Sequence, residues 1–130
     1  MPAHAVVTIV DETAGSGRRI AFRLELWSVK VTARELIERR VRHEVDAYNA
    51  SPSDSFPGLV EPVGAAGSRR GWQVKAIDAS EQVAIALKAF SAGQVLLFVD
   101  DRQVDALDDE FALRRDAEVC FYKLVPLVGG

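Results

Sequence analysis

Alternation of hydrophobic and polar side chains predicts two strands at the start of the chain. Residues 5–10 form a short apolar run rich in β-branched residues, which is typical of a buried strand. From residue 19 the alternation is regular: one face carries Ile20, Phe22, Leu24 and Leu26, and the other carries Arg19, Ala21, Arg23 and Glu25. A turn with two glycines separates the runs, so the pattern predicts an antiparallel hairpin with one buried and one solvated face.

Helical spacing of apolar residues follows between residues 32 and 51. Thr32 and Glu35 have the spacing of a capping box, in which each side chain accepts a hydrogen bond from the other residue's backbone N–H. The expected apolar stripe is Leu36, Ile37, Val41, Val45 and Tyr48, and the expected outer positions are Arg34, Glu38, Arg39, Arg42, Glu44 and Asp46. Pro52 cannot extend a helix, so this one should end within residues 49–51.

Residues 51–80 are expected to form an inserted loop region, because most of them are turn formers with few apolar residues between them. Residues 72–77 are interpreted as a short strand or an extended segment. A second helix then begins at Asp78 or Ser80, with Glu81 able to complete a capping box, and stops at Gly93. The apolar residues that can pin the loop to the body are Phe56, Leu59 and Val60.

The last third of the chain returns to strand patterns. Residues 95–99 are a continuous apolar run, followed by a tight turn at 100–102 and a brief return strand at 103–104. An irregular connection with apolar anchors leads to a final strand, in which Val119 and Phe121 share one face and Cys120 and Tyr122 the other. The order of elements predicts an α+β fold in a single domain spanning residues 1–130.

Composition narrows the class of protein. With 48% hydrophobic and 27% charged residues, the 130-residue chain is expected to be a globular protein of the cytoplasm, without a membrane span. The net charge of −3 argues against nucleic acid as a partner. The first residues lack the basic stretch and cleavage site of a signal peptide. Cys120 is the one cysteine and lies among apolar neighbours, so it is interpreted as a packed residue and no metal site is expected.

Candidate chemistry lies at the C-terminal end. Pro126 removes a backbone donor, so residues 125–130 are expected to leave the sheet as an extended tail that reaches roughly 20 Å. The tail ends in Gly129 and Gly130, which could enter a narrow active site because neither has a Cβ atom. The α-carboxylate of Gly130 is anionic at neutral pH and can attack the α-phosphate of ATP. A disordered end without function is the alternative for two terminal glycines.

Three segments resemble ubiquitin-like proteins. Residues 94–105 are similar to the ubiquitin segment that runs strand, turn, Gln, Leu, acid, with one extra residue in the turn, and residues 107–113 are similar to the segment that follows it. Residues 125–130 resemble the Pro-Pro-Val-x-Gly-Gly end of the small subunit of molybdopterin synthase. The resemblance covers the hairpin, the first helix and everything after Gly93, but not residues 51–80. It implies a β-grasp fold, a mixed sheet packed on one main helix, here with an inserted loop and a second helix.

The resemblance also implies a function. An E1-like adenylating enzyme would use ATP and Mg to activate the Gly130 carboxylate, so the protein would be a substrate and carrier, not an enzyme, and would bind no cofactor itself. An enzyme cysteine would then take the acyl group as a thioester and pass it, through an E2-like protein, to lysines of target proteins; an isopeptidase is a further expected partner. One alternative is a sulfur carrier with a C-terminal thiocarboxylate. A second alternative is a β-grasp interaction domain that is not conjugated.

The same resemblance assigns recognition residues. Gly129 and Gly130 would be the site of activation, and the activating enzyme would recognise Val128, Leu127 and Pro126. Ubiquitin-like proteins dock through a hydrophobic patch on the sheet beside the root of the tail. Here the matching positions are Leu97, in the apolar strand, and Leu124.

Overall fold

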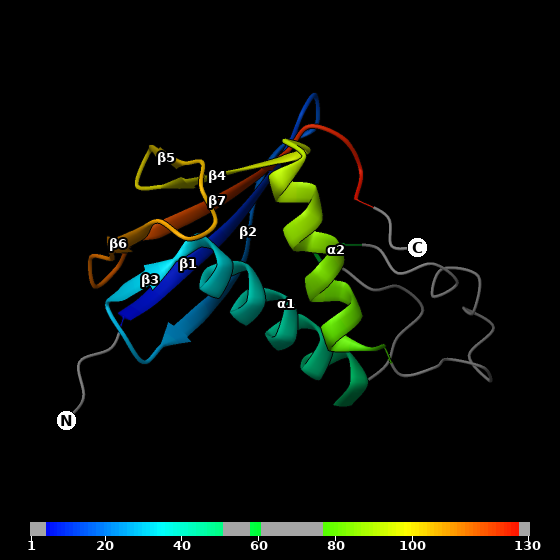
Figure 1. Cartoon of the computed structure of the whole chain (residues 1–130), viewed down its shortest axis with the longest axis horizontal. Coiled ribbons are helices and arrows are strands. Elements are labelled where there is room, and N and C mark those ends of the chain that lie inside the picture. The colour runs from blue at the N-terminus through cyan, green and yellow to red at the C-terminus, as the bar shows by residue number, and fades with distance from the viewer. Residues whose placement is uncertain (1–4, 51–57, 61–76, 128–130) are drawn as a thin grey trace.

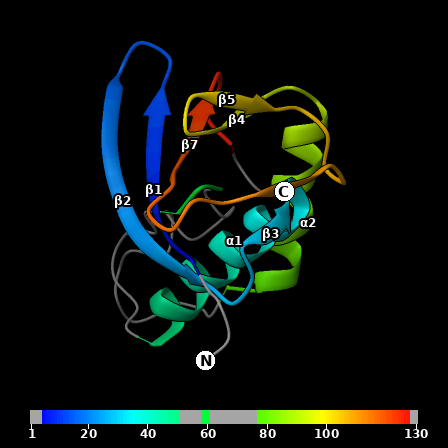
Figure 2. The same cartoon turned by 90° about the vertical axis from the view of Figure 1, so that its left-hand side faces the viewer.

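A computed structural model describes residues 5–50, 58–60 and 77–127, and the predicted α+β class is confirmed (Figure 1). A mixed sheet has two helices on one of its faces (Figure 2). In chain order the elements are β1 (Ala5–Thr13), β2 (Gly17–Leu26), β3 (Lys30–Thr32), α1 (Ala33–Ala50), α2 (Ala79–Ser91), β4 (Val95–Val99), β5 (Arg102–Val104), β6 (Glu110–Ala112) and β7 (Glu118–Lys123). Neither helix of the described ranges is long and apolar enough to cross a membrane.

The first and last strands lie side by side in the middle of the sheet. The strand order is β2-β1-β7-β4-β5, in which β1 and β7 are parallel and every other pair is antiparallel. The short strands β3 and β6 form a separate antiparallel pair. Neither short strand has a counterpart among the predicted elements, because three residues are too few to show a period.

The predicted hairpin of β1 and β2 is present, but a β-bulge changes which side chains are buried. Ile9 pairs with Phe22 and Val10 pairs with Ile20, so Ala21 is an extra residue on β2. An extra residue inverts the alternation beyond it. Ile20, predicted to share the buried face with Phe22, is therefore turned to the opposite face and is 68% exposed. Arg19 is turned the other way, towards Asp11, with 3.6 Å between Nη2 and Oδ2.

The start of α1 follows its predicted cap. The Thr32 backbone N–H donates to Glu35 Oε1 at 2.9 Å, and the Glu35 backbone N–H donates to Thr32 Oγ1 at 3.1 Å. These two bonds satisfy backbone donors that have no partner inside the helix. The predicted apolar stripe, Leu36, Ile37, Val41, Val45 and Tyr48, is buried, and the helix ends at Ala50, inside the expected range.

Helix α2 also has both of its predicted ends. Asp78 is the N-cap, and its carboxylate accepts hydrogen bonds from the backbone of Ser80 and Glu81. At the other end Gly93 has φ of 76°, a left-handed conformation that glycine adopts without a Cβ clash. The N–H of Gly93 donates to the carbonyl of Phe90, and that of Gln94 donates to Ala89. This pair of bonds is a Schellman motif, and it turns the chain into β4.

Side chains of both helices hold the described parts of the inserted region. Leu59 and Val60 are buried, as predicted for residues that pin the loop. Glu44 Oε1 accepts a hydrogen bond from the Leu59 N–H, and Gln82 Nε2 donates to the Val60 carbonyl. The Asn49 amide bonds both backbone groups of Ile77. Phe56 and nearly all of the expected segment 72–77 lie outside the described residues.

Candidate functional site

The C-terminal segment leaves the sheet at the predicted place. After β7 the Leu124 N–H donates to the Gln94 carbonyl at 3.0 Å, and no further strand pairing follows within the described residues. Leu124 and Val125 are each 44% exposed, and Pro126 is also exposed. The segment then bends back towards the side of the sheet that carries the helices (Figure 1). Leu127 is only 4% exposed and belongs to the hydrophobic core.

Burial of Leu127 corrects the prediction of an extended tail that begins at Val125. The sequence interpretation assigned Leu127 to recognition by an activating enzyme, but the side chain lies in the protein's own core. The physical reason is that burying a leucine side chain is worth about 1.5–3 kcal/mol, and the core offers that burial without a partner. Val128, Gly129 and Gly130 lie outside the described residues.

The prediction that Leu97 is an exposed docking residue is also wrong. Leu97 is fully buried. It pairs with Phe121 on β7 and with Val104 on β5, and both of these residues are also buried. Because β4 is apolar at every position, its sequence has no alternation that shows which face is buried. The helices cover the face with Val95, Leu97 and Val99, so Leu96 and Phe98 point to the opposite face.

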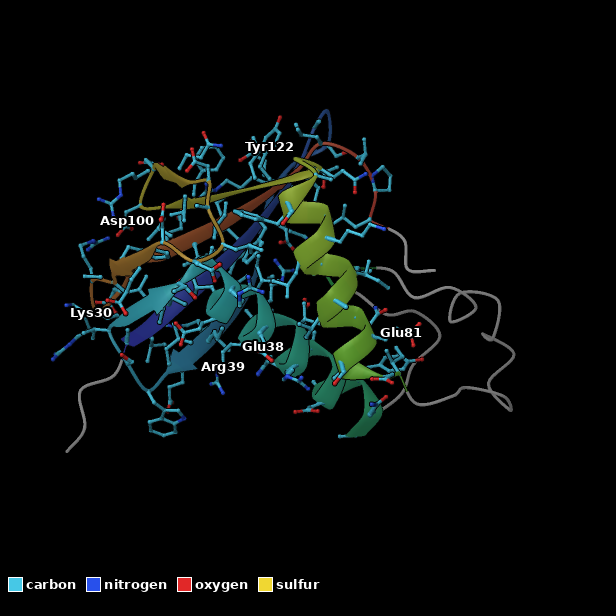
Figure 3. The ribbon with its side chains drawn as sticks, in the orientation of Figure 1. Lys30, Glu38, Arg39, Glu81, Asp100 and Tyr122 are labelled. Carbon is cyan, nitrogen blue, oxygen red and sulfur yellow. The ribbon has the colours of Figure 1, made fainter. Side chains whose placement is uncertain are left out.

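The face of the sheet opposite the helices, called the outer face here, carries an apolar strip. Val10 on β1, Cys120 on β7 and Phe98 on β4 lie directly opposite one another across the strands. Tyr122 and Leu96 form the next pair along the same face, and Figure 3 shows Tyr122 near the end of β7. Ile20 completes the strip at the bulge of β2. Beside the end of β7, the exposed Leu124 is the predicted docking residue whose accessibility fits that role.

An ion pair crosses the strip. Arg18 on β2, at the level of Tyr122, pairs with Glu118 on β7, at the level of Thr8, and so reaches across β1. Val10 and Cys120 are buried, and Cys120 Sγ lies 4.0 Å from Glu12 Oε1. Burial, together with the negative charge of Glu12, raises the pKa of Cys120. The thiol therefore stays protonated at neutral pH, which suits a packed residue and not a nucleophile.

A buried charged cluster, which was not among the sequence predictions, lies on the helix side of the sheet. Arg40 of α1 is fully buried; its guanidinium donates to Asp11 Oδ1 at 2.5 Å, to Asp11 Oδ2 at 2.7 Å and to Glu44 Oε2 at 3.0 Å. The guanidinium carbon lies 4.6 Å from the centroid of the Phe121 ring. The centroid of the Phe22 ring lies 5.8 Å from the same carbon, and this ring stacks on the ring of His43.

A signal for this cluster exists in the sequence. Arg40 and Glu44 follow Leu36 at intervals of four residues, so both fall on the apolar stripe of the helix. Glu44 was expected on the outside; its side chain is 9% exposed. A pair of opposite charges at this spacing inside an apolar stripe indicates a buried ion pair.

The cluster is structural and does not form a binding site. Its guanidinium is closed off from solvent and is already paired with two carboxylates. Of the residues the structure describes, no group of three or more His, Cys, Asp or Glu could hold a metal ion. The exposed residues Leu124, Val125 and Pro126, with the adjoining outer face, form the candidate functional site.

No family model, curated protein or solved structure matches this chain. What the protein does is therefore inferred from its own residues and geometry.

Proposed function

We propose that the protein is a ubiquitin-like modifier with a β-grasp fold, which an E1-like enzyme activates at the Gly130 carboxylate. The observation that carries the proposal is the place of β7. The last strand lies between β1 and β4 at the centre of the sheet and leads directly into the segment that ends in Gly129 and Gly130. The order β2-β1-β7-β4-β5, with its parallel central pair, supports the β-grasp assignment.

The proposed chemistry needs only the C-terminal carboxylate of this chain. The Gly130 carboxylate attacks the α-phosphate of ATP, with Mg bound by the activating enzyme, and pyrophosphate leaves. A cysteine thiolate of the enzyme attacks the acyl-adenylate, AMP leaves, and a thioester forms. After transfer to an E2-like protein, a lysine amine of a target attacks the thioester and forms an isopeptide bond. An isopeptidase would reverse this last step by hydrolysis.

Docking of the activating enzyme is proposed on the outer face. Leu96 and Phe98 take the place of Leu97, because they occupy the outward positions of the same strand. Leu124 lies at the root of the C-terminal segment, two residues after Tyr122, which pairs with Leu96. Ile20 is exposed, and Leu96, Phe98 and Tyr122 are partly exposed on the same face. Accessible apolar side chains beside charged ones are typical of a protein contact surface.

A sulfur carrier is the second candidate function, and the residues at 126–130 favour it. Their similarity to the end of the small subunit of molybdopterin synthase extends through the proline and both glycines. In this case sulfide replaces AMP on the acyl-adenylate and leaves a thiocarboxylate. The activation step is the same, so only the product distinguishes the two candidates.

A non-conjugated interaction domain is the third candidate, and burial of Leu127 favours it. A C-terminal segment that is anchored in the core is less accessible to another protein's active site than a free tail. In this case the outer face would be the functional surface, and the two glycines would have no role.

Intact mass spectrometry distinguishes these candidates. The chain, expressed with Gly130 as its last residue, is incubated with a candidate adenylating enzyme, Mg-ATP and cell extract; the control lacks Gly129 and Gly130. Adducts to lysines of other proteins support the modifier, and a mass gain equal to the exchange of one oxygen for one sulfur supports the carrier. Full biological activity of the control variant would contradict both and leave the interaction domain.

A further inference from the structure

The two edge strands of the sheet, β2 and β5, lie on opposite sides of it (Figure 2) and carry charges of opposite sign. β2 has three exposed arginines, Arg18, Arg19 and Arg23. β5 lies between two exposed aspartates, Asp101 and Asp105. We infer that copies of this chain associate head to tail, with β2 of one copy beside β5 of the next.

The first part of β2 is open to a further strand. In the described sheet β2 has β1 on one side and no strand on the other. Arg39 of α1 donates to the Glu25 carbonyl and so covers the end of the strand. Residues 17–23, which include the three arginines, receive no such bond from a described side chain. Ile20 in this stretch is 68% exposed and offers an apolar contact beside the charges.

The acidic edge has carboxylates without a partner in the described chain. Residues 100–110 contain six acidic residues and one basic residue, Arg102. Two of the acids are held by arginines of the same chain. Asp101 and Asp105 form no ion pair with any described residue. They directly precede and follow β5, so a strand laid along β5 would pass both.

The arginines of β2 are able to bind these carboxylates. Arg18 and Arg23 lie opposite Glu12 and Thr8 of β1, so they are about 13 Å apart along the edge, similar to the span of the two aspartates. Arg23 lies 3.8 Å from Asp116, and both side chains are more than half exposed, so this ion pair is weak. Arg18 can keep Glu118 and bind a second carboxylate, because a guanidinium has five N–H donors.

Charge also selects the head-to-tail arrangement over a symmetric one. Pairing of β2 with β2 of a second copy would bring arginines against arginines, and like charges on paired strands are destabilising. A contact between two different edges leaves one edge free on each end of a dimer, so further copies can add. Exposed charges are screened by salt, so the association should weaken as ionic strength rises.

Sedimentation equilibrium of the parent chain tests the association directly. At low salt the weight-average mass should rise with protein concentration beyond the mass of a dimer, and about 0.5 M NaCl should return it towards that of the monomer. A chain that stays monomeric at low salt up to about 1 mM would overturn the proposal.

Two variants, each with one edge neutralised, test the arrangement. The first carries Arg18→Gln and Arg23→Gln, and the second carries Asp101→Asn and Asp105→Asn; asparagine tolerates the positive φ of position 101. Circular dichroism checks that both fold. Each variant alone should stay monomeric at concentrations where the parent associates. An equimolar mixture should form a one-to-one dimer and nothing larger, because each variant keeps one charged edge.

Two results with the variants would contradict the head-to-tail contact. Self-association of the aspartate variant alone would mean that β2 pairs with β2. A mixture that stays monomeric would mean that surfaces other than these two edges hold the copies of the parent together. The salt dependence of the parent chain decides the role of charge whether or not a variant folds.

Discussion

Arg40 is the residue whose role is least expected from its type. Arginine is rarely fully buried unless its charge is paired. Burial alone would lower the pKa of Arg40, but the hydrogen bonds that it donates to Asp11 and the negative charge of Glu44 raise the pKa, so the guanidinium stays charged. The contact with the Phe121 ring adds a cation–π interaction. Arg40 thereby joins α1 to β1 and β7.

Loss of the Arg40 charge should destabilise the protein strongly. In Arg40→Met the carboxylates of Asp11 and Glu44 stay in the core without their cation, so the free energy of unfolding should fall by about 3–5 kcal/mol. Urea unfolding followed by circular dichroism measures this change. The matched control is Arg39→Met: Arg39 is exposed on the same helix, its Nη2 donates to the Glu25 carbonyl, and its loss should cost less than about 1 kcal/mol. Equal losses in the two variants would contradict a buried charge cluster.

At the scale of single elements, β4 shows how packing decides the facing of an apolar strand. All five of its residues are hydrophobic, so either face could have been buried. The helices cover Leu97, and the neighbouring Leu96 and Phe98 stay half-buried on the outer face. The two faces of one strand thus have different roles.

Paired substitutions on β4 test this facing. Leu97→Ala should lower the free energy of unfolding by about 2–5 kcal/mol, because it leaves a cavity in the core. Leu96→Ala, the same chemical change one residue away, should cost less than about 1.5 kcal/mol, because Leu96 is only half-buried. Chemical denaturation of both variants gives the comparison. A larger loss in Leu96→Ala would mean that the facing is inverted.

The turn between β4 and β5 is tied to the start of β7 by Asp100. Asp100 and Asp101 both have positive φ, 48° and 70°, as a two-residue hairpin turn of type I′ requires. The Asp100 carboxylate accepts hydrogen bonds from Arg114 and from the Glu118 N–H. The bonds from Arg114, followed by the one from Glu118, hold the pKa of Asp100 below its usual range.

Asp100 should therefore contribute to stability only when it is ionised. A carboxyl group whose pKa is lowered by folding stabilises the protein above its unfolded pKa of about 3.9, and that contribution disappears as pH falls through the folded pKa. Asp100→Asn should be less stable than the parent chain at pH 7, and the difference should shrink below about pH 4. Denaturation midpoints measured across this range check the prediction. A difference that stays constant with pH would show that the charge of Asp100 has no role.

At the scale of the whole molecule, the first and last strands of the chain pair with each other inside the sheet. β1 and β7 pair in parallel although more than a hundred residues separate them in the chain. Each has a strand on both sides, and β5 forms an edge of only three residues. The C-terminal segment thus starts from the most enclosed part of the sheet.

Native-state hydrogen exchange should be slowest in the enclosed strands β1 and β7 and faster in the edge strand β5. Backbone amides of β1 and β7 should exchange only through global unfolding, because their hydrogen bonds lie inside the sheet. Amides of β5 should exchange faster through local opening. Amide-resolved NMR exchange rates provide the test, and slower exchange in β5 than in β7 would contradict the central position of β7.

Much of the fold could be predicted because its signals are local. The capping box at Thr32, the cap at Asp78 and the stop at Gly93 each depend on residues within one helical turn. The fold class followed from the order of such elements. Of the candidate site, Leu124 is exposed, and its docking role stays a prediction, as do the roles of Gly129 and Gly130.

The sequence by itself determined where both helices begin and end and where the longer strands lie, because periodicity and end caps act between near neighbours. Only the tertiary structure decided which side chains these elements bury. The bulge at Ala21 exposes Ile20, the helices select Leu97 over Leu96, and the core takes in Leu127. Each of these outcomes depends on strand register or on partners far away in the chain, and no local pattern contains that information.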